Sequence, residues 1–306
     1  MTCRLFKQHY PWSKPVYSNV DCVFKEARGQ LFSNLNNGLK GKNREVVIAA
    51  PGNVNLNGLW VQNERRGVIL FVPGINCLYE EAAEPWIVRP FIDFFQRTFS
   101  GVDVLIVNPR GVAASEGVST RTTLKVDLFC SFQFLVNQGF DPNKIISWGH
   151  SLGGARALLA GALAQKEYPD KKINVVTDRS FLSLQDVVKA RAPCGGRILA
   201  NYIDKNWLEI DCFDAAESLK GRVVAIASDE DDTVPYEASF VSKYKTKKQD
   251  NYVAINLDKS EPHRGKIYPH TRSLTSDEGA KVVAALGAIF DEKNSEVSAR
   301  VEEIKS

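Results

Sequence analysis

The sequence has few of the residues that build metal and redox centres. Its 306 residues include six cysteines, four histidines and one methionine, and no two cysteines have a C-x-x-C spacing. This pattern predicts neither a zinc knuckle nor a redox pair, so we expect reduced thiols and no metal site or cofactor. Any reaction that needs an imidazole has only four histidines to draw on.

The sequence also lacks a strong excess of charge. Its 39 basic and 36 acidic residues give a net charge of +3, whereas a nucleic-acid-binding domain usually has a clustered basic excess. We therefore expect no nucleic-acid partner. The short basic run Lys243–Lys248 could meet anionic lipid headgroups at a membrane surface, but we favour a solvated helix end as its interpretation.

Long apolar runs are absent. Met1–Tyr10 has no apolar segment of the kind that a secretory signal needs. The longest apolar helical stretch, Leu152–Ala164, is interrupted by glycines and an arginine and is too short to cross a bilayer. We expect a soluble protein that is cytoplasmic by default. Neither export as a bacterial effector nor the oligomeric state can be read from the sequence.

After residues 1–44, strand-length apolar runs alternate with helix-length periodic segments. The predicted strands are Glu45–Ala50, Leu56–Gln62, Gly67–Val72, Val102–Val107, Lys144–Trp148, Lys172–Thr177, Arg222–Ala227 and Asn251–Leu257. The predicted helices are Pro90–Phe99, Thr122–Gln138, Leu152–Gln165, Tyr236–Tyr244 and Ser276–Phe290. Several strands are apolar throughout, which is typical of parallel strands that are covered on both faces.

This alternation predicts an α/β fold with one doubly wound, eight-stranded, mostly parallel sheet and helices on both faces. Only Pro51–Asn55 separates the first two strands, so we expect an antiparallel hairpin at one edge. The less regular segment 179–221 is interpreted as a small cap insertion. The core then comprises residues 45–178 and 222–306, with residues 1–44 packed on it as a lead-in.

The strongest chemical signal is a G-x-S-x-G motif, Gly149-His150-Ser151-Leu152-Gly153, between a predicted strand and a predicted helix. A turn sharp enough to raise a serine hydroxyl above a sheet crowds its main chain, and glycines two residues to either side relieve that crowding. The serine then sits at a helix N-terminus, whose free N–H groups stabilise developing negative charge. Ser151 is therefore the candidate nucleophile.

A nucleophilic serine needs a histidine as base. His9 lies in the polar lead-in, and His150 is expected to point away from the chemistry of the serine. Two histidines follow the last predicted strand. We favour His263, which lies within one loop of the end of that strand, and keep His270 as the alternative base.

The base in turn needs an acid to orient it. Four consecutive acidic residues, Asp229–Asp232, follow the strand Arg222–Ala227, at the sheet edge where functional loops of α/β proteins gather. Asp231 is preferred, with Asp232 and Asp229 as alternatives. The order Ser, Asp, His along the chain agrees with a nucleophile elbow.

These motifs resemble the α/β-hydrolase superfamily over roughly Glu45–Phe290. Phe71–Asn76 is similar to the oxyanion loop of that family, and Asn108–Gly111 with Ser115–Gly117 is similar to its D-x-R-G-x-G-x-S-x-G turn. Asp231 precedes Val-Pro as the family's catalytic acid does. More closely, the sequence resembles the monoacylglycerol-lipase-like and serine-aminopeptidase-like branch, and uncharacterised hydrolases of the chlamydial and Legionella type.

The resemblance implies an α/β-hydrolase fold and a serine hydrolase that cleaves a carboxylic ester or thioester of an acyl or lipid-like substrate. It also implies an oxyanion hole formed by the main-chain N–H groups of Ile75 and Leu152. The sequence departs from the family at Pro73, where a histidine is usual, and at Pro262, where a glycine usually precedes the catalytic histidine. The second departure leaves the base open between His263 and His270.

Other roles also fit parts of the sequence. Arg110 is expected to form a structural salt bridge beneath the loops of the elbow. The apolar residues of the predicted cap suit an acyl chain, but the same residues could pack the cap onto the core. A catalytically inactive binding or scaffold protein, a peptidase or an acyltransferase of the same fold are the alternative functions.

Overall fold

The computed structural model describes residues 42–74, 77, 79, 88–191, 210–244, 250–258, 269–287, 289 and 290. Eight strands form one open sheet in the order β1-β2-β4-β3-β5-β6-β7-β8. They are β1 Lys42–Ala50, β2 Val54–Gln62, β3 Val68–Val72, β4 Asp103–Val107, β5 Ile145–His150, β6 Asn174–Asp178, β7 Val223–Ala227 and β8 Tyr252–Asn256. Every predicted strand is therefore confirmed, with ends that move by a few residues.

The sheet is parallel from β4 through β8, and β1 and β2 pair with their neighbours in antiparallel register. This arrangement confirms the predicted edge hairpin and the predicted doubly wound α/β class. The order places the carboxyl ends of β5, β6, β7 and β8 side by side at one edge of the sheet. Loops that follow these four strands can therefore meet there.

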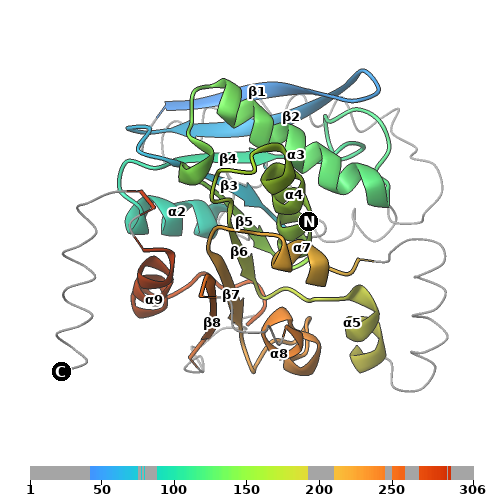
Figure 1. Ribbon diagram of the computed structural model, residues 1–306, viewed down its shortest axis with the longest axis vertical. Coiled ribbons are helices and arrows are strands. Elements are labelled where there is room, and N and C mark those ends of the chain that lie inside the picture. The colour runs from blue at the N-terminus through green and yellow to red at the C-terminus, as the bar shows by residue number, and fades with distance from the viewer. Residues whose placement is uncertain are drawn as a thin grey trace, which may run out of the picture.

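Helices cover both faces of the sheet, as Figure 1 shows. The helices are α2 Val88–Thr98, α3 Arg121–Asn137, α4 Leu152–Glu167, α5 Leu184–Arg191, α7 Phe213–Glu217, α8 Phe240–Lys243 and α9 Ser276–Leu286, with short 3₁₀ turns η3 Pro142–Lys144 and η4 Tyr236–Ala238. Alternate residues of β3 enter two separate apolar clusters: Leu70 lies on the face covered by α3 and α4, and Phe71 on the face covered by α2 and α9.

Two predicted helices end earlier or are interrupted. The chain predicted as one helix over Tyr236–Tyr244 is divided into η4 and α8, because Ser239 is extended and caps α8 by accepting the N–H of Ser242. The last helix stops at Leu286 instead of continuing to Phe290, because Gly287 adopts a φ of 66°. Its N-cap is Thr275, in a reciprocal capping box with Glu278.

The predicted cap, residues 179–221, contributes α5 and α7 to the described part of the chain, whereas residues 192–209 lie outside it. Phe181, Ile210 and Cys212, near the two ends of this segment, belong to the larger apolar cluster of the core. The boundaries of a cap remain a prediction. Among the described residues, Cys130 and Cys212 are free thiols. No helix within the described ranges is long and apolar enough to cross a membrane.

Arg110 forms the structural salt bridge that the sequence predicts. Its guanidinium donates to Oδ1 of Asp127, from Nε at 2.8 Å and from Nη2 at 2.6 Å, and its main-chain N–H donates to Oδ2. Both residues are buried. The pair joins the turn after β4 to helix α3, on the face of the sheet that α4 also covers.

Helix α4 approaches the sheet at main-chain distance. A Cβ atom on Gly153 would overlap the carbonyl oxygen of Val72 at the end of β3, so the helix could not take its place with any other residue there. Farther along the same helix, a Cβ on Gly161 would meet only side chains, the nearest being Cγ2 of Val175 at 2.9 Å.

We therefore expect Gly153→Ala to lower the free energy of unfolding by at least about 2 kcal/mol, because the main chain of α4 would have to move away from the main chain of β3 to make room for the added Cβ. The matched control, Gly161→Ala in the same helix, should change it by less than about 1 kcal/mol, since helix propensity offsets a small rearrangement of side chains. Urea denaturation measures both values. Equal losses in the two variants would contradict the argument from main-chain contact.

Candidate active site

Ser151 occupies a sharp turn between β5 and α4. Its φ of 55° and ψ of −126° lie outside the regions that residues with a side chain normally adopt. A Cβ on Gly149 would overlap the main chain at Gly153, which confirms why the motif needs these two glycines. The main-chain N–H of Ser151 donates to the carbonyl oxygen of Asp178 at 2.9 Å, so the turn is tied to the end of β6.

Asp231 is distinguished from its acidic neighbours by burial. It is 8% exposed, whereas Asp229, Glu230 and Asp232 are exposed. Its Oδ1 accepts the main-chain N–H groups of Thr233 and Val234, each at 2.8 Å, which fixes the carboxylate in the loop after β7. An oriented, buried carboxylate is what a catalytic imidazole requires of its partner.

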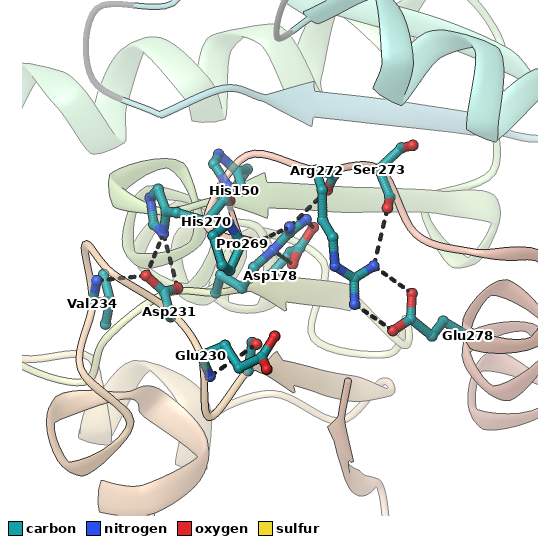
Figure 2. Close-up of polar contacts among 12 residues, drawn as sticks. His150, Asp178, Glu230, Asp231, Val234, Pro269, His270, Arg272, Ser273 and Glu278 are labelled. Carbon is teal, nitrogen blue, oxygen red and sulfur yellow. Dashed lines mark hydrogen bonds and ion pairs between the residues drawn. The ribbon is translucent and has the colours of Figure 1, made fainter. Parts of the chain in front are cut away.

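The imidazole that meets Asp231 belongs to His270. Its Nδ1 lies 2.9 Å from Oδ1 and 2.8 Å from Oδ2 of Asp231, as Figure 2 shows. Because an ionised carboxylate only accepts hydrogen bonds, Nδ1 carries a proton in this pair, and Nε2 does not bond to Asp231. His263, the histidine favoured from the sequence, lies outside the described residues. The geometry thus brings together Asp231 and the alternative base.

His150 is part of this arrangement, contrary to the expectation that it points away. Its ring lies 4.8 Å from that of His270 between centroids, and its Nε2 is 2.6 Å from the carbonyl oxygen of His270. Since a carbonyl only accepts, Nε2 of His150 carries a proton. Burial holds the pKa of His150 well below its usual value, and the charge of Arg179 lowers this pKa further.

Of the two main-chain N–H groups predicted to form the oxyanion hole, only that of Leu152 belongs to the described residues. Leu152 is the first residue of α4, where main-chain N–H groups have no partner within the helix. The other predicted donor, Ile75, lies outside the described residues. The residue before it is placed, however: a Cβ on Gly74 would lie 3.1 Å from Cβ of Ser151 and 3.4 Å from Nδ1 of His150. Gly74, two residues after the end of β3, therefore lies beside the serine.

Known proteins resemble this chain in sequence and in fold. A family model described as Chlamydia CHLPS protein (DUF818) matches residues 69–274, a span that includes Ser151, Asp231 and His270. Protein bem46 of Schizosaccharomyces pombe is 26% identical over 135 residues, which cover 44% of this chain and 43% of that protein. A multifunctional-autoprocessing repeats-in-toxin protein of Vibrio cholerae is 38% identical over 88 residues, 28% of this chain and 2% of the toxin.

The chain thus spans less than half of the length of these curated relatives. Among solved structures, an α/β hydrolase from Vibrio vulnificus has a TM-score of 0.62 at 20% identity, covering 90% of this chain and 95% of that one. The esterase Pf2001 of Pyrococcus furiosus has a TM-score of 0.58 at 19% identity, covering 82% and 91%. These likenesses show that the fold is that of the α/β hydrolases.

The tautomer of His150 can be tested directly by NMR with ¹⁵N-labelled histidine. Because His150 is buried and its pKa is low, its ring should stay neutral, with the proton on Nε2, throughout about pH 5 to pH 8. An exposed histidine would become an imidazolium over the same range. Titration of the His150 ring within it would contradict the lowering of its pKa by burial, and a neutral ring with the proton on Nδ1 would contradict the hydrogen bond to the His270 carbonyl.

Proposed function

This chain belongs to the Chlamydia CHLPS protein family (DUF818) and has the α/β-hydrolase fold, and we propose that it is a serine hydrolase of carboxylic esters or thioesters. The observation that carries the proposal is the buried Asp231–His270 pair, whose histidine also bonds to the residue next to Ser151. A strained serine, an oriented imidazole and a fixed carboxylate from three separate loops are the components of a catalytic triad.

In the proposed reaction, Oγ of Ser151 attacks the carbonyl carbon of the substrate. Nε2 of His270 takes the hydroxyl proton and returns it to the leaving group, while Asp231 holds the proton on Nδ1. The N–H groups of Leu152 and Ile75 stabilise the oxyanion of the tetrahedral intermediate. Water, activated by the same imidazole, then hydrolyses the acyl-enzyme and frees Ser151.

The substrate is proposed to carry an apolar acyl group. Leu182, Leu184 and Val187, at and near the start of α5, are only partly buried and leave apolar surface available. Helix α5 lies beside the loop of the acid, because Nε of Arg191 donates to the carbonyl oxygen of Thr233 at 3.2 Å. An acyl chain that extends from the reacting carbonyl would lie on this surface of the predicted cap, to which α5 belongs.

A fluorophosphonate probe tests the nucleophile. We expect the wild-type protein to be labelled and Ser151→Ala to remain unlabelled, because only an activated serine attacks the probe. Ser131→Ala is the matched control: this serine is also buried, but it only donates to the carbonyl oxygen of Asp127, so labelling should persist. A folded wild-type protein that is not labelled would instead support the inactive scaffold.

Replacing the histidines one at a time tests the base. His270→Ala should slow labelling by roughly 10⁶-fold, the loss in kcat that removal of the triad histidine causes in a serine protease. His263→Ala should leave the rate within about twofold, as a substitution outside the triad does. The reverse result would return the role of base to His263.

The acid is tested in the same assay with two neighbouring carboxylates. Asp231→Asn should cost roughly 10⁴-fold in the rate of labelling, because an amide no longer holds the imidazole in the required tautomer. Asp232→Asn, at an exposed position, should have little effect. Equal effects of the two substitutions would contradict the assignment of Asp231.

A further inference from the structure

Two charged residues at the end of β6 are completely buried. Nε and Nη2 of Arg179 donate to Oδ1 and Oδ2 of Asp178, at 2.7 and 2.9 Å, and both side chains are 0% exposed. Arg179 also adopts a φ of 47°, which is unfavourable for a residue with a long side chain. Burying an ion pair between adjacent residues costs desolvation, so such a pair does not by itself explain a gain in stability.

The remaining nitrogen of this guanidinium indicates another role. Nη1 of Arg179 donates to the carbonyl oxygen of Pro269 at 2.9 Å and to that of Arg272 at 2.6 Å. These two carbonyls lie on either side of His270 in the sequence, and Figure 2 shows Pro269, His270 and Arg272 gathered beside Asp178. The arginine therefore bonds to the main chain of the turn that carries the proposed base.

A third carbonyl in the same turn also accepts a hydrogen bond from a buried side chain. The carbonyl oxygen of His270 accepts Nε2–H of His150, the residue that pairs with Asp178 across β5 and β6. Three carbonyls in the turn 269–272 are thus held by two buried side chains from the ends of adjacent strands. On the far side of the turn, the side chain of Arg272 bonds to Glu278 at 2.6 and 2.7 Å, in the first turn of α9.

From this geometry we propose that Arg179 is a positioning residue for His270, an inference that rests on the proposed function. His270 lies in neither a helix nor a strand, so bonds to its main chain have to fix the position of its imidazole. Asp178 neutralises the charge of Arg179 and accepts hydrogen bonds from Nε and Nη2 of its guanidinium. The third nitrogen, Nη1, is therefore available to bond to the turn. A base displaced by about 1 Å costs roughly 10² in rate, and the bonds of Arg179 prevent that displacement.

The experiment compares two buried arginines, each paired with an aspartate. Arg179→Lys keeps the charge beside Asp178, but an ammonium cannot bond to the carboxylate and to two carbonyls in the planar geometry of a guanidinium. Arg110→Lys makes the same change at the Asp127 pair, where the guanidinium bonds to Asp127 and to the carbonyl oxygen of Pro51 instead of to the His270 turn. Any general effect of replacing a buried arginine should therefore appear in both variants.

We expect Arg179→Lys to lower kcat for a short p-nitrophenyl ester about 10²-fold with KM within about threefold, because the base moves while substrate binding is kept. Arg110→Lys should leave kcat within about threefold of the wild type, and both variants should melt at similarly reduced temperatures. Equal values of kcat in the two variants, or a change confined to KM, would overturn the proposal.

A second variant and a second measurement cover the case in which Arg179→Lys does not fold. Asp178→Asn with Arg179→Gln removes both charges together and leaves no unpaired buried charge. NMR then follows the downfield proton of His270 Nδ1–H, which is protected while Asp231 holds it, whether or not the protein has activity. Loss of this resonance in the double variant supports the proposal, and an unchanged resonance overturns it. If the wild-type protein is not labelled by the fluorophosphonate probe, but the His270 resonance is lost in the double variant, the proposed function is rejected and the positioning role of Arg179 stands.

Discussion

The contact between helix α4 and the end of β3 constrains the whole site. Helix and strand meet main chain to main chain at Gly153 and Val72, a distance that no side chain allows. With α4 fixed so close to the sheet, the chain has a single residue in which to turn from β5 into the helix, and that residue is Ser151. The φ of 55° at Ser151 is the consequence, and the cost of this strain is met by the packing of the surrounding core.

The positions of Asp231 and His270 depend on hydrogen bonds that involve main-chain groups. Asp231 is fixed by N–H groups of its own loop, whereas the turn of His270 is fixed by side chains that bond to its carbonyls. The two buried arginine–aspartate pairs of the described chain differ accordingly. Arg110 and Asp127 join two elements of the core, while Arg179 and Asp178 join the end of a strand to an irregular turn.

The sequence predicts the framework well because its signals are local. All eight strands carry apolar runs of the right length, and the G-x-S-x-G motif with a strand before it and a helix after it places Ser151 at the elbow. Asp231, which the sequence favours through the Val234-Pro235 that follows it, is the buried member of its acidic run. Each of these features depends on residues that are close together in the chain.

The rest of the site depends on contacts that local patterns do not report. The proximity of His263 to the end of the last strand favours it over His270, but the described geometry pairs Asp231 with His270, farther along the chain. His150 and Arg179 reach their partners over separations of 120 and about 90 residues, and no motif predicts either contact. Bonds to main-chain carbonyls leave no pattern in the sequence, because every residue has a carbonyl.

The most direct test of the account is a crystal structure of the protein after reaction with a dialkyl phosphoryl ester, which leaves a stable adduct on an activated serine. We predict the phosphorus on Oγ of Ser151, a phosphoryl oxygen facing the N–H of Leu152, and Nε2 of His270 within hydrogen-bonding distance of an ester oxygen. An adduct at another residue, or one whose neighbouring imidazole belongs to His263 while His270 points elsewhere, would contradict the convergence of Ser151, His270 and Asp231.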